Sequence, residues 1–281
     1  MKTNRITRTR LLILFVLFLF FSFGGYFIGA NTEIILPVFN CEYVGGGTTR
    51  GVCIAMTEFN KHIHNGWTFP LGVAACIALV LLFGRLWCGY VCPMGFFQDV
   101  VTWIRQKLNI TQINIPQKLK PFILVGRWYL VFYIFFYDLC KVCPVQFITV
   151  PLTGYTSNTG STGFFWTVVL LVAVMLSDRA FCRVCPIGAL MGLANRISGS
   201  RLRKCGHACT HCRACLEVCP VDIQEVYEDR EHVDITHADC IYCMKCIEVC
   251  PEKDALRFDL FGKTIYSSDR VTQEGQHGAE N

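Results

Sequence analysis

Cysteine spacing constrains this chain more than any other feature of its sequence. The residues from Cys205 to Pro220 read CGHACTHCRACLEVCP, and a second run, CIYCMKCIEVCP, begins at Cys240. Each run contains three cysteines separated by two residues, followed by three further residues and a Cys-Pro pair. This is the spacing of bacterial ferredoxins, in which the fourth cysteine binds the cluster of the other run. It therefore predicts two [4Fe-4S] clusters in one small domain.

Crossed pairing gives each predicted cluster three ligands from one run and one from the other. Cluster 1 takes Cys209, Cys212, Cys215 and Cys250, and cluster 2 takes Cys240, Cys243, Cys246 and Cys219. Structural zinc is the alternative, but zinc sites usually show two separated cysteine pairs rather than a triplet with a Cys-Pro. Cys205 is left over, either as a substitute ligand of cluster 1 or as a buried thiol.

Apolar runs elsewhere in the chain predict a membrane protein. Of the 281 residues, 53% are hydrophobic and 17% are charged, against about 25% charged residues in an average soluble domain. A helix that crosses a hydrocarbon core of about 30 Å needs about 20 apolar residues. Four runs approach that length, namely Leu11 to Ala30, Trp67 to Phe83, Pro121 to Leu139 and Gly163 to Leu176. The expected fold is an α-helical membrane protein with four transmembrane helices plus a small α+β dicluster ferredoxin domain.

Domain boundaries follow from these runs. We expect a four-helix transmembrane domain over residues 1–200, a ferredoxin domain over residues 201–258, and a flexible polar tail over residues 259–281. Lys and Arg concentrate at the N-terminus, between the second and third runs, and after the fourth. Because cytoplasmic segments carry excess positive charge, the protein is predicted in the cytoplasmic membrane with both termini in the cytoplasm. No nucleic-acid-binding motif accompanies the net charge of +5.

Further cysteines lie near the ends of the predicted membrane helices. One quartet is expected at the inner face, consisting of Cys88, Cys92, Cys182 and Cys185. A second quartet is expected at the outer face, consisting of Cys41, Cys53, Cys140 and Cys143. We interpret the inner quartet as ligands of a further iron–sulfur cluster, with a redox dithiol, structural zinc or simple packing as alternatives. At the oxidising outer face, disulfides compete with a cluster.

The sequence shows no nucleophile–base pair, phosphate-binding glycine loop or haem-attachment motif. Electron transfer through clusters is the chemistry that remains. Because cluster potentials span roughly −700 to +450 mV, the motifs do not fix the direction of electron flow. Clusters need a donor and an acceptor, so we expect partner redox proteins in a complex.

The elements GRLWCGYVCPMGFFQD and DRAFCRVCPIGAL, followed by the two ferredoxin runs, resemble the NapH/MauN group of ferredoxin-type membrane proteins and the iron–sulfur half of NosR. The likeness covers about Trp67 to Phe258. It implies a quinol dehydrogenase component or an electron relay between the quinone pool and a partner redox enzyme, with quinone as an exchangeable substrate. By matching position, Cys88, Cys92, Cys182 and Cys185 are the family's membrane-end cysteines. The extra CKVCP motif and the Cys41/Cys53 pair depart from the NapH pattern.

A second class of function is maturation. Resemblance to NosR implies an electron-donating factor that activates a metalloenzyme, including metal or thiol reduction at the outer face. A redox sensor is disfavoured, because the sequence shows no regulatory output domain. Reduction of the clusters by a quinol would distinguish the electron relay from the maturation factor.

Overall fold

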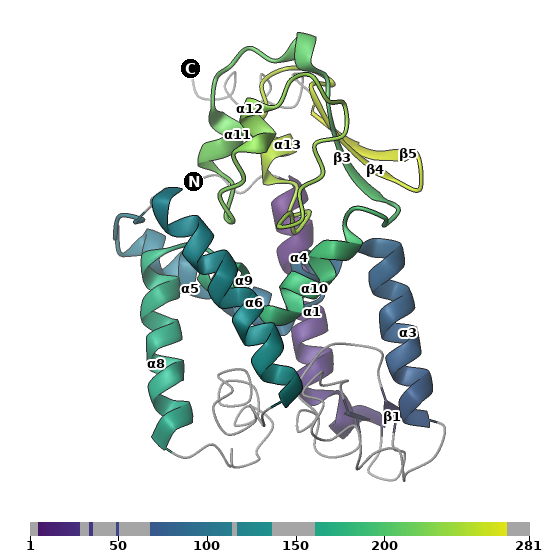
Figure 1. Cartoon of the computed structure of the whole chain (residues 1–281), viewed down its shortest axis with the longest axis vertical. Helices are drawn as coiled ribbons and strands as arrows, with labels where there is room; N and C mark the ends of the chain where they lie inside the picture. The colour runs from purple at the N-terminus through teal and green to yellow at the C-terminus, as the bar shows by residue number, and fades with distance from the viewer. Residues whose placement is uncertain are drawn as a thin grey trace. The chain divides into compact units, whose positions relative to one another are not determined.

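The computed structural model describes residues 5–28, 34–35, 49–50, 68–113, 117–136 and 161–268. The chain divides into two compact units that alternate along the sequence. The first unit contains Met1–Leu12, Val80–Tyr90 and Leu190–Asn281, and the second contains Ile13–Leu79 and Val91–Ala189. Figure 1 labels their helices and strands. The predicted boundary at residue 200 differs from this division, because segments before it join the ferredoxin runs.

Long helices occupy the first two thirds of the chain. They are α1 (Arg5–Ile28), α3 (Thr68–Phe83), α5 (Pro93–Lys107), α6 (Lys120–Phe136) and α8 (Ser161–Leu176). Shorter elements are β1 (Ile34–Ile35), β2 (Thr49–Arg50), α4 (Leu86–Tyr90), η3 (Gln117–Leu119), α9 (Ala180–Val184) and α10 (Pro186–Ala194). Strands β1 and β2 pair in parallel. Each of the four apolar runs overlaps one long helix, namely α1, α3, α6 or α8.

In the described parts of the chain, no helix combines the length and the apolar character that crossing a membrane requires. Helices α3, α6 and α8 have 16, 17 and 16 residues. At 1.5 Å per residue they are about 24 to 26 Å long, which is less than a hydrocarbon core of about 30 Å. Helix α1 has 24 residues, but its first turns carry Arg5, Arg8 and Arg10. The prediction of an α-helical membrane protein with four transmembrane helices is therefore wrong.

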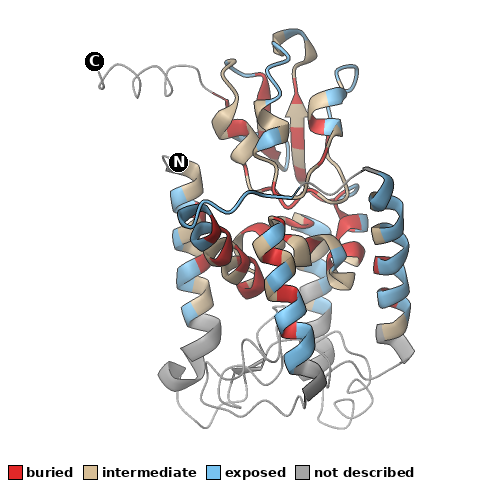
Figure 2. Ribbon diagram, turned by 90° about the vertical axis from the view of Figure 1, so that its left-hand side faces the viewer, coloured by how far each residue is buried: buried red, intermediate tan, exposed pale blue. Residues whose placement is uncertain are grey.

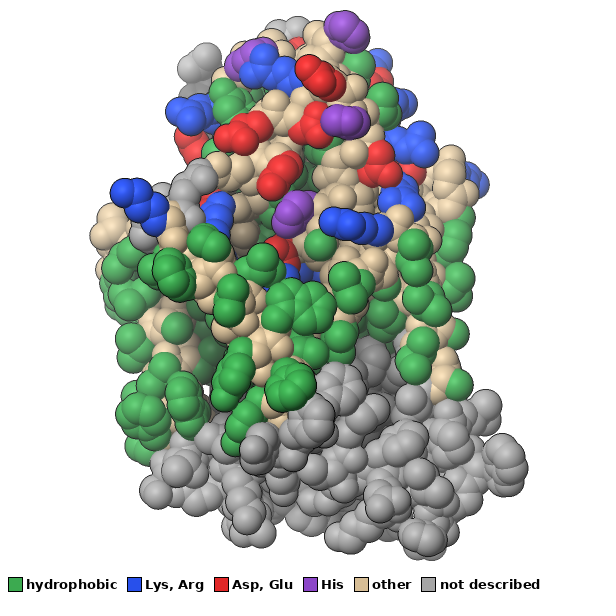
Figure 3. Space-filling model, viewed as in Figure 1, with side chains coloured by type: hydrophobic (Ala, Val, Ile, Leu, Met, Phe, Trp, Pro, Cys, Tyr) green, Lys and Arg blue, Asp and Glu red, His purple; other side chains and the backbone are tan. Residues whose placement is uncertain are grey.

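In the second unit, buried contacts and exposed apolar faces occur on the same helices. Met94 and Val101 of α5 pack with Leu170 and Val174 of α8 in a buried cluster. Large hydrophobic side chains nevertheless remain exposed on α6 and α8, including Phe122, Val125, Phe132, Phe164 and Phe165. Figures 2 and 3 show this exposed hydrophobic surface along the helices. The exposed faces explain why the sequence reads as more apolar than an average soluble domain.

A three-stranded antiparallel sheet supports the ferredoxin runs in the first unit. Its strands, in the order β3-β4-β5, are β3 (Ser200–Lys204), β4 (Leu256–Leu260) and β5 (Lys263–Ser267). The short helices are η6 (Gly206–Ala208), α11 (Ala214–Glu217), α12 (Glu225–Glu228) and α13 (Lys245–Val249). Leu202 pairs with Phe258 across the sheet, and both side chains are buried in the core with Ile223 and Ile247. Each run is thereby anchored to one core.

The β4–β5 hairpin corrects the predicted flexible tail, which was placed from residue 259 onward. Leu260 pairs with Lys263, so Phe261 and Gly262 form a two-residue turn. Both have positive φ, 49° and 79° respectively, as a tight hairpin turn with the twist of the flanking strands requires. Alternating burial of Leu256 and Phe258 fixes β4 to the core. The ordered domain therefore extends at least to Ser268.

Candidate iron–sulfur centres

The two ferredoxin runs form loops with the same backbone conformation. In the first loop His211 and Arg213, on either side of Cys212, have φ of 62° and 63°. In the second loop Tyr242 and Met244, on either side of Cys243, have φ of 50° and 62°. Left-handed residues without glycine cost about 1–3 kcal/mol each, so the surrounding structure must hold them. Alternation of right- and left-handed residues turns backbone N–H groups into a concavity that favours an anionic group, as in many iron–sulfur sites.

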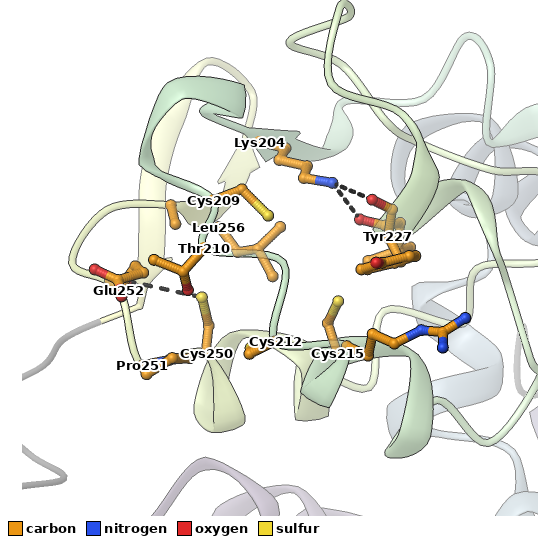
Figure 4. A pocket seen from close by; sticks show the side chains of 13 residues that line it. Lys204, Cys209, Thr210, Cys212, Cys215, Tyr227, Cys250, Pro251, Glu252 and Leu256 are labelled. Carbon is orange, nitrogen blue, oxygen red and sulfur yellow. Dashed lines mark hydrogen bonds between the residues drawn. The ribbon is translucent and has the colours of Figure 1, made fainter.

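The cysteines predicted for cluster 1 surround one pocket. Its lining includes Cys209, Cys212, Cys215 and Cys250, together with Lys204. Figure 4 shows the sulfur atoms of Cys209, Cys215 and Cys250 pointing into the space beneath the Lys204 side chain. Cys250 comes from the second run, as the crossed pairing predicts. The structure therefore brings the four predicted ligands of cluster 1 together.

Burial raises the pKa of two of these thiols, Cys215 and Cys250. Burial raises the pKa of Cys215 to about 11, although the Lys204 ammonium opposes this rise. Burial also raises the pKa of Cys250. Iron binds the thiolate, so each such thiol must release a proton when a cluster forms. Cys215 and Cys250 thus favour the neutral thiol without metal and would bind iron as thiolates.

The cysteines predicted for cluster 2 also lie near one another. Burial, together with the neighbouring Cys243 and Cys219 thiols, raises the pKa of Cys240 to about 12. Burial also raises the pKa of Cys246 well above its usual value, with added repulsion from Cys243, Cys240 and Cys219. These mutual effects place Cys219 of the first run beside the second loop. The four predicted ligands therefore lie close to one another, with Cys240 buried and the other three partly buried.

The arrangement suits a cube better than a single ion. Among the described residues, no three His, Cys, Asp or Glu side chains are placed to hold one metal ion. A cube makes a different demand, because each of its four irons takes a single protein thiolate. Two sets of four separated cysteines, each beside a loop with left-handed residues, meet that demand. The residues present fit two [4Fe-4S] clusters.

Arg85 and Asn195 hold the segment that leads into the second loop. Arg85 Nη1 donates to Asp239 Oδ1 at 2.9 Å and to the Ala238 carbonyl at 3.1 Å. Asn195 Nδ2 donates to the Ala238 carbonyl at 3.3 Å and to the Cys240 carbonyl at 3.0 Å. Asn195 Oδ1 accepts from Arg85 N at 2.7 Å. Because Asn195 and Arg85 are buried, these bonds fix Cys240 from inside the unit.

Two glycines let helices approach the same loop. A Cβ on Gly89 of α4 would lie 2.2 Å from the Ile241 carbonyl oxygen. A Cβ on Gly192 of α10 would lie 2.6 Å from the Ala238 carbonyl oxygen. Both obstacles are backbone atoms, which cannot rotate away as a side chain can. Helices α4 and α10 therefore form a close backing for the second loop.

The second unit contains a separate polar site around Cys182. Gln98 Nε2 lies 3.4 Å from Cys182 Sγ, and Arg179 Nη1 lies 3.9 Å from the same sulfur. Asp99 holds Arg179 through Oδ1 to Nε at 2.9 Å and Oδ2 to Nη2 at 2.5 Å. Burial alone would lower the pKa of Arg179, but the Asp99 carboxylate and Cys182 raise it above its usual value. A buried cation and an amide donor therefore face this sulfur.

The inner quartet is divided between the two units. Cys92, Cys182 and Cys185 belong to the second unit, and Cys88 belongs to the first. Cys185 Sγ accepts a hydrogen bond from Gly188 N at 3.4 Å. Cys88 Sγ lies 3.8 Å from Met191 Sδ. A cluster bound by all four stays a prediction.

The predicted outer quartet and Cys205 are the remaining cysteines that the sequence singles out. Cys41, Cys53, Cys140 and Cys143, the predicted outer quartet, lie outside the described residues. Cys205 is half-buried, and its backbone N–H bonds the Ala255 carbonyl at 2.9 Å. The thiol of Cys205 does not line the pocket of the first set.

Sequence reasoning missed several polar residues that support these sites. They are Arg85, Gln98, Arg179, Asn195 and Lys204. Arg85 and Arg179 each stand three residues before a Cys-x-x-Cys or Cys-x-x-x-Cys element, and that shared offset was a usable signal. Asn195 and Lys204 have no comparable signal, because their roles depend on segments distant in sequence.

Comparison with known protein families identifies iron–sulfur domains. Residues 65–111 and 159–205 match a 4Fe-4S binding domain family, and residues 208–253 match a 4Fe-4S dicluster domain family. The first match contains Cys88, Cys92, Cys182 and Cys185. The second contains all eight cysteines predicted for clusters 1 and 2. Both matches therefore fall on the cysteine motifs that the sequence singles out.

Individual relatives extend this result. The methylamine utilization ferredoxin-type protein MauN of Methylorubrum extorquens is 30% identical over 53% of this chain and 54% of its own length. The ferredoxin-type protein NapH of Haemophilus influenzae is 28% identical over 57% of this chain and 56% of its own length. The regulatory protein NosR of Stutzerimonas stutzeri is 27% identical over 54% of this chain and 22% of its own length. The chain thus spans about half the length of the MauN and NapH relatives.

These relatives confirm the resemblance that the cysteine motifs indicated. No solved structure is significantly similar to the chain.

Proposed function

The chain is an iron–sulfur electron-transfer protein related to the MauN and NapH ferredoxin-type proteins, and we propose that it relays electrons between the quinone pool and a partner redox enzyme. The observation that carries the proposal is the grouping of eight cysteines into two sets of four. The cysteines of the first set line one pocket. The cysteines of the second set lie close enough to affect one another's pKa. Two redox groups in one small domain suit electron transfer better than structural support alone.

Each set of four cysteines would hold one cluster. Cys209, Cys212, Cys215 and Cys250 would hold one [4Fe-4S] cluster, and Cys219, Cys240, Cys243 and Cys246 would hold the other. When bound, such clusters supply reversible one-electron redox chemistry. The left-handed residues of each loop belong to the kind of turn whose backbone N–H groups form anion-binding concavities in many iron–sulfur sites. Arg85 and Asn195 keep the second loop in place.

Anaerobic purification of the full chain, followed by iron and acid-labile sulfide analysis, tests the clusters. We expect both elements in amounts that fall on Cys212→Ala and again on Cys243→Ala. A quinol and its quinone are then mixed with the oxidised and the reduced protein, and cluster absorbance is followed. Electron exchange in either direction supports the quinone relay. Colourless protein that contains zinc and no sulfide contradicts the whole assignment.

An electron-donating maturation factor is the second candidate. The match to a regulatory protein, NosR, favours it. The same experiment separates the two, because a maturation factor would leave the quinol unoxidised. It would instead pass electrons from reduced clusters to a copper ion or a disulfide added as the acceptor.

A further inference from the structure

Lys204 places a buried positive charge at the wall of the first pocket. It is the last residue of β3, where Ser200, Leu202 and Lys204 all point to the buried side of the strand. Only 3% of its surface is exposed. Figure 4 shows its side chain extending over the sulfurs of the pocket. Strand alternation places position 204 in the core, and a cation occupies that position.

Three backbone carbonyls make this burial tolerable. Lys204 Nζ donates to the carbonyl oxygens of Val226 at 2.8 Å, Tyr227 at 2.9 Å and Asp229 at 2.7 Å. An ammonium has three donors, so all of them are satisfied. Within the described part of the chain, no carboxylate forms an ion pair with it. Its hydrogen bonds are therefore complete while its formal charge remains unneutralised.

The second site has a cation of a different kind. Arg85 acts on Cys240 electrostatically, but Arg85 Nη1 is paired with the Asp239 carboxylate at 2.9 Å. The two opposite charges largely cancel at the distance of a cluster. The first pocket is lined by Lys204, Arg213 and Glu252, so its wall keeps a net positive charge, whereas the Arg85 charge near the second site is paired with Asp239.

A net charge matters for a redox group because reduction adds one negative charge. Coulomb attraction to a nearby cation is stronger for the more negative state, particularly where water is excluded. The reduced form is then favoured, and the midpoint potential rises. Removing the cation without disturbing the ligands should lower that potential.

We propose that Lys204 tunes the first cluster, so that the site formed by Cys209, Cys212, Cys215 and Cys250 is reduced before the site formed by the second set. This inference rests on the proposed electron-transfer function. With both clusters bound, one electron would pass from the reduced second cluster, which is oxidised, to the first cluster, which is reduced, and no covalent bond would form or break. Because Thr210 to Arg213 are exposed and Cys240 to Tyr242 are buried, the favoured site is also the more accessible one. The first site is therefore the one that exchanges electrons with a partner protein.

The test is a redox titration of the full chain followed by EPR spectroscopy. Cys212→Ser and Cys243→Ser variants assign one signal to each site. Lys204→Met removes the charge, Lys204→Gln removes it but keeps an amide donor, and Lys204→Arg keeps it. Lys253→Met, at an exposed position three residues after Cys250, controls for loss of a solvated charge.

We expect the Cys212-sensitive signal to shift to lower potential in the Met and Gln variants and to stay near the wild-type value in the Arg and Lys253 variants. The Cys243-sensitive signal should not move in any of them. An unchanged Cys212-sensitive potential, or an equal shift of both signals, overturns the proposal. Loss of the first cluster in all three Lys204 variants also overturns it, because Lys204 would then be a folding residue.

The wild-type protein supplies a measurement that needs no Lys204 variant. The Cys212-sensitive signal should be the first to be reduced as the potential is lowered. If the Cys243-sensitive signal is reduced first, the proposal is wrong even though the protein still holds two clusters. Absence of iron and sulfide would instead contradict the proposed function itself, so the two failures are distinguishable.

Discussion

Asn195 shows how one side chain can control a distant loop. It has no exposed surface, and its amide bonds the N–H of Arg85 and the carbonyls of His237, Ala238 and Cys240. An amide is required, because the site needs an acceptor on one side and donors on the other. A carboxylate has the same shape but offers no donor when ionised.

Asn195→Asp should therefore release the Cys240 loop. It leaves buried carbonyls without donors, at about 1–3 kcal/mol for each unsatisfied group, and adds repulsion from the carboxylate. We expect the free energy of unfolding to fall by about 3 kcal/mol and the Cys243-sensitive EPR signal to weaken. Asn109→Asp makes the same chemical change at an exposed position and should be near neutral. Equal iron content and thermal stability in the two variants would contradict this role.

Asp99 and Arg179 form a buried ion pair within the second unit. Arg179 is 1% exposed and is left-handed at φ 51°, so its conformation depends on its partners. Removing one member of a buried ion pair leaves an uncompensated charge, which costs about 3–5 kcal/mol. Asp99→Asn should destabilise the protein by about that amount, measured by denaturant unfolding.

Asp234→Asn is the matched control for this substitution. Asp234 pairs with Arg201 at 3.3 Å, and the two side chains are 45% and 28% exposed. Pairs of this kind contribute about 0–1 kcal/mol. If Asp99→Asn proves no more destabilising than Asp234→Asn, the Arg179 charge is not held by Asp99 alone.

Three helical glycines differ in the space that their surroundings leave for a side chain. Gly89 and Gly192 allow α4 and α10 to lie against backbone carbonyls of the second loop, whereas a Cβ on Gly126 in α6 would meet no atom within 4 Å. A methyl group in a closely packed site costs about 1–3 kcal/mol. In an open helical position it instead stabilises by about 0.5–1 kcal/mol, because glycine lowers helix stability.

The three Gly→Ala substitutions should therefore differ in sign. Gly89→Ala and Gly192→Ala should lower the melting temperature and reduce iron bound at the second site. Gly126→Ala should leave iron content unchanged and raise the melting temperature slightly. Differential scanning calorimetry with iron analysis measures both quantities. A neutral Gly89→Ala variant would show that α4 does not back the Cys240 loop closely.

The sequence located the long helices correctly, but it gave the wrong fold class and did not reveal the β4–β5 hairpin. Apolar runs located α1, α3, α6 and α8, because uniform hydrophobicity in a window of this length favours helix. The same runs gave the wrong fold class, since hydrophobicity does not determine the length at which a helix ends. Helix α3 ends at Phe83, directly before Gly84, which is left-handed at φ 58°. The β4–β5 hairpin was missed because its polar outer face hid the inward alternation of Leu256 and Phe258.

Cysteine spacing was the more informative signal for the molecule as a whole. It grouped Cys250 with the first run and Cys219 with the second. In the structure Cys250 lines the pocket of the first run, and Cys219 lies near Cys243 of the second run. Spacing could do this because ligand geometry is a local property of a short loop. It could not reveal Lys204 or Asn195, whose effects arise only after segments far apart in sequence have packed. The charge and the support of each site are therefore properties of the fold.

Crossed pairing makes a test that only the complete ferredoxin region can answer. Cys250 lies in the second run but lines the first pocket, whereas the pKa of Cys219 is raised by burial and by Cys243 of the second run. Cys250→Ser should therefore weaken the EPR signal that Cys212→Ser weakens. Cys219→Ser should weaken the signal that Cys243→Ser weakens. If each substitution affects the cluster of its own run, the two runs are independent sites and the fold does not join them through their ligands.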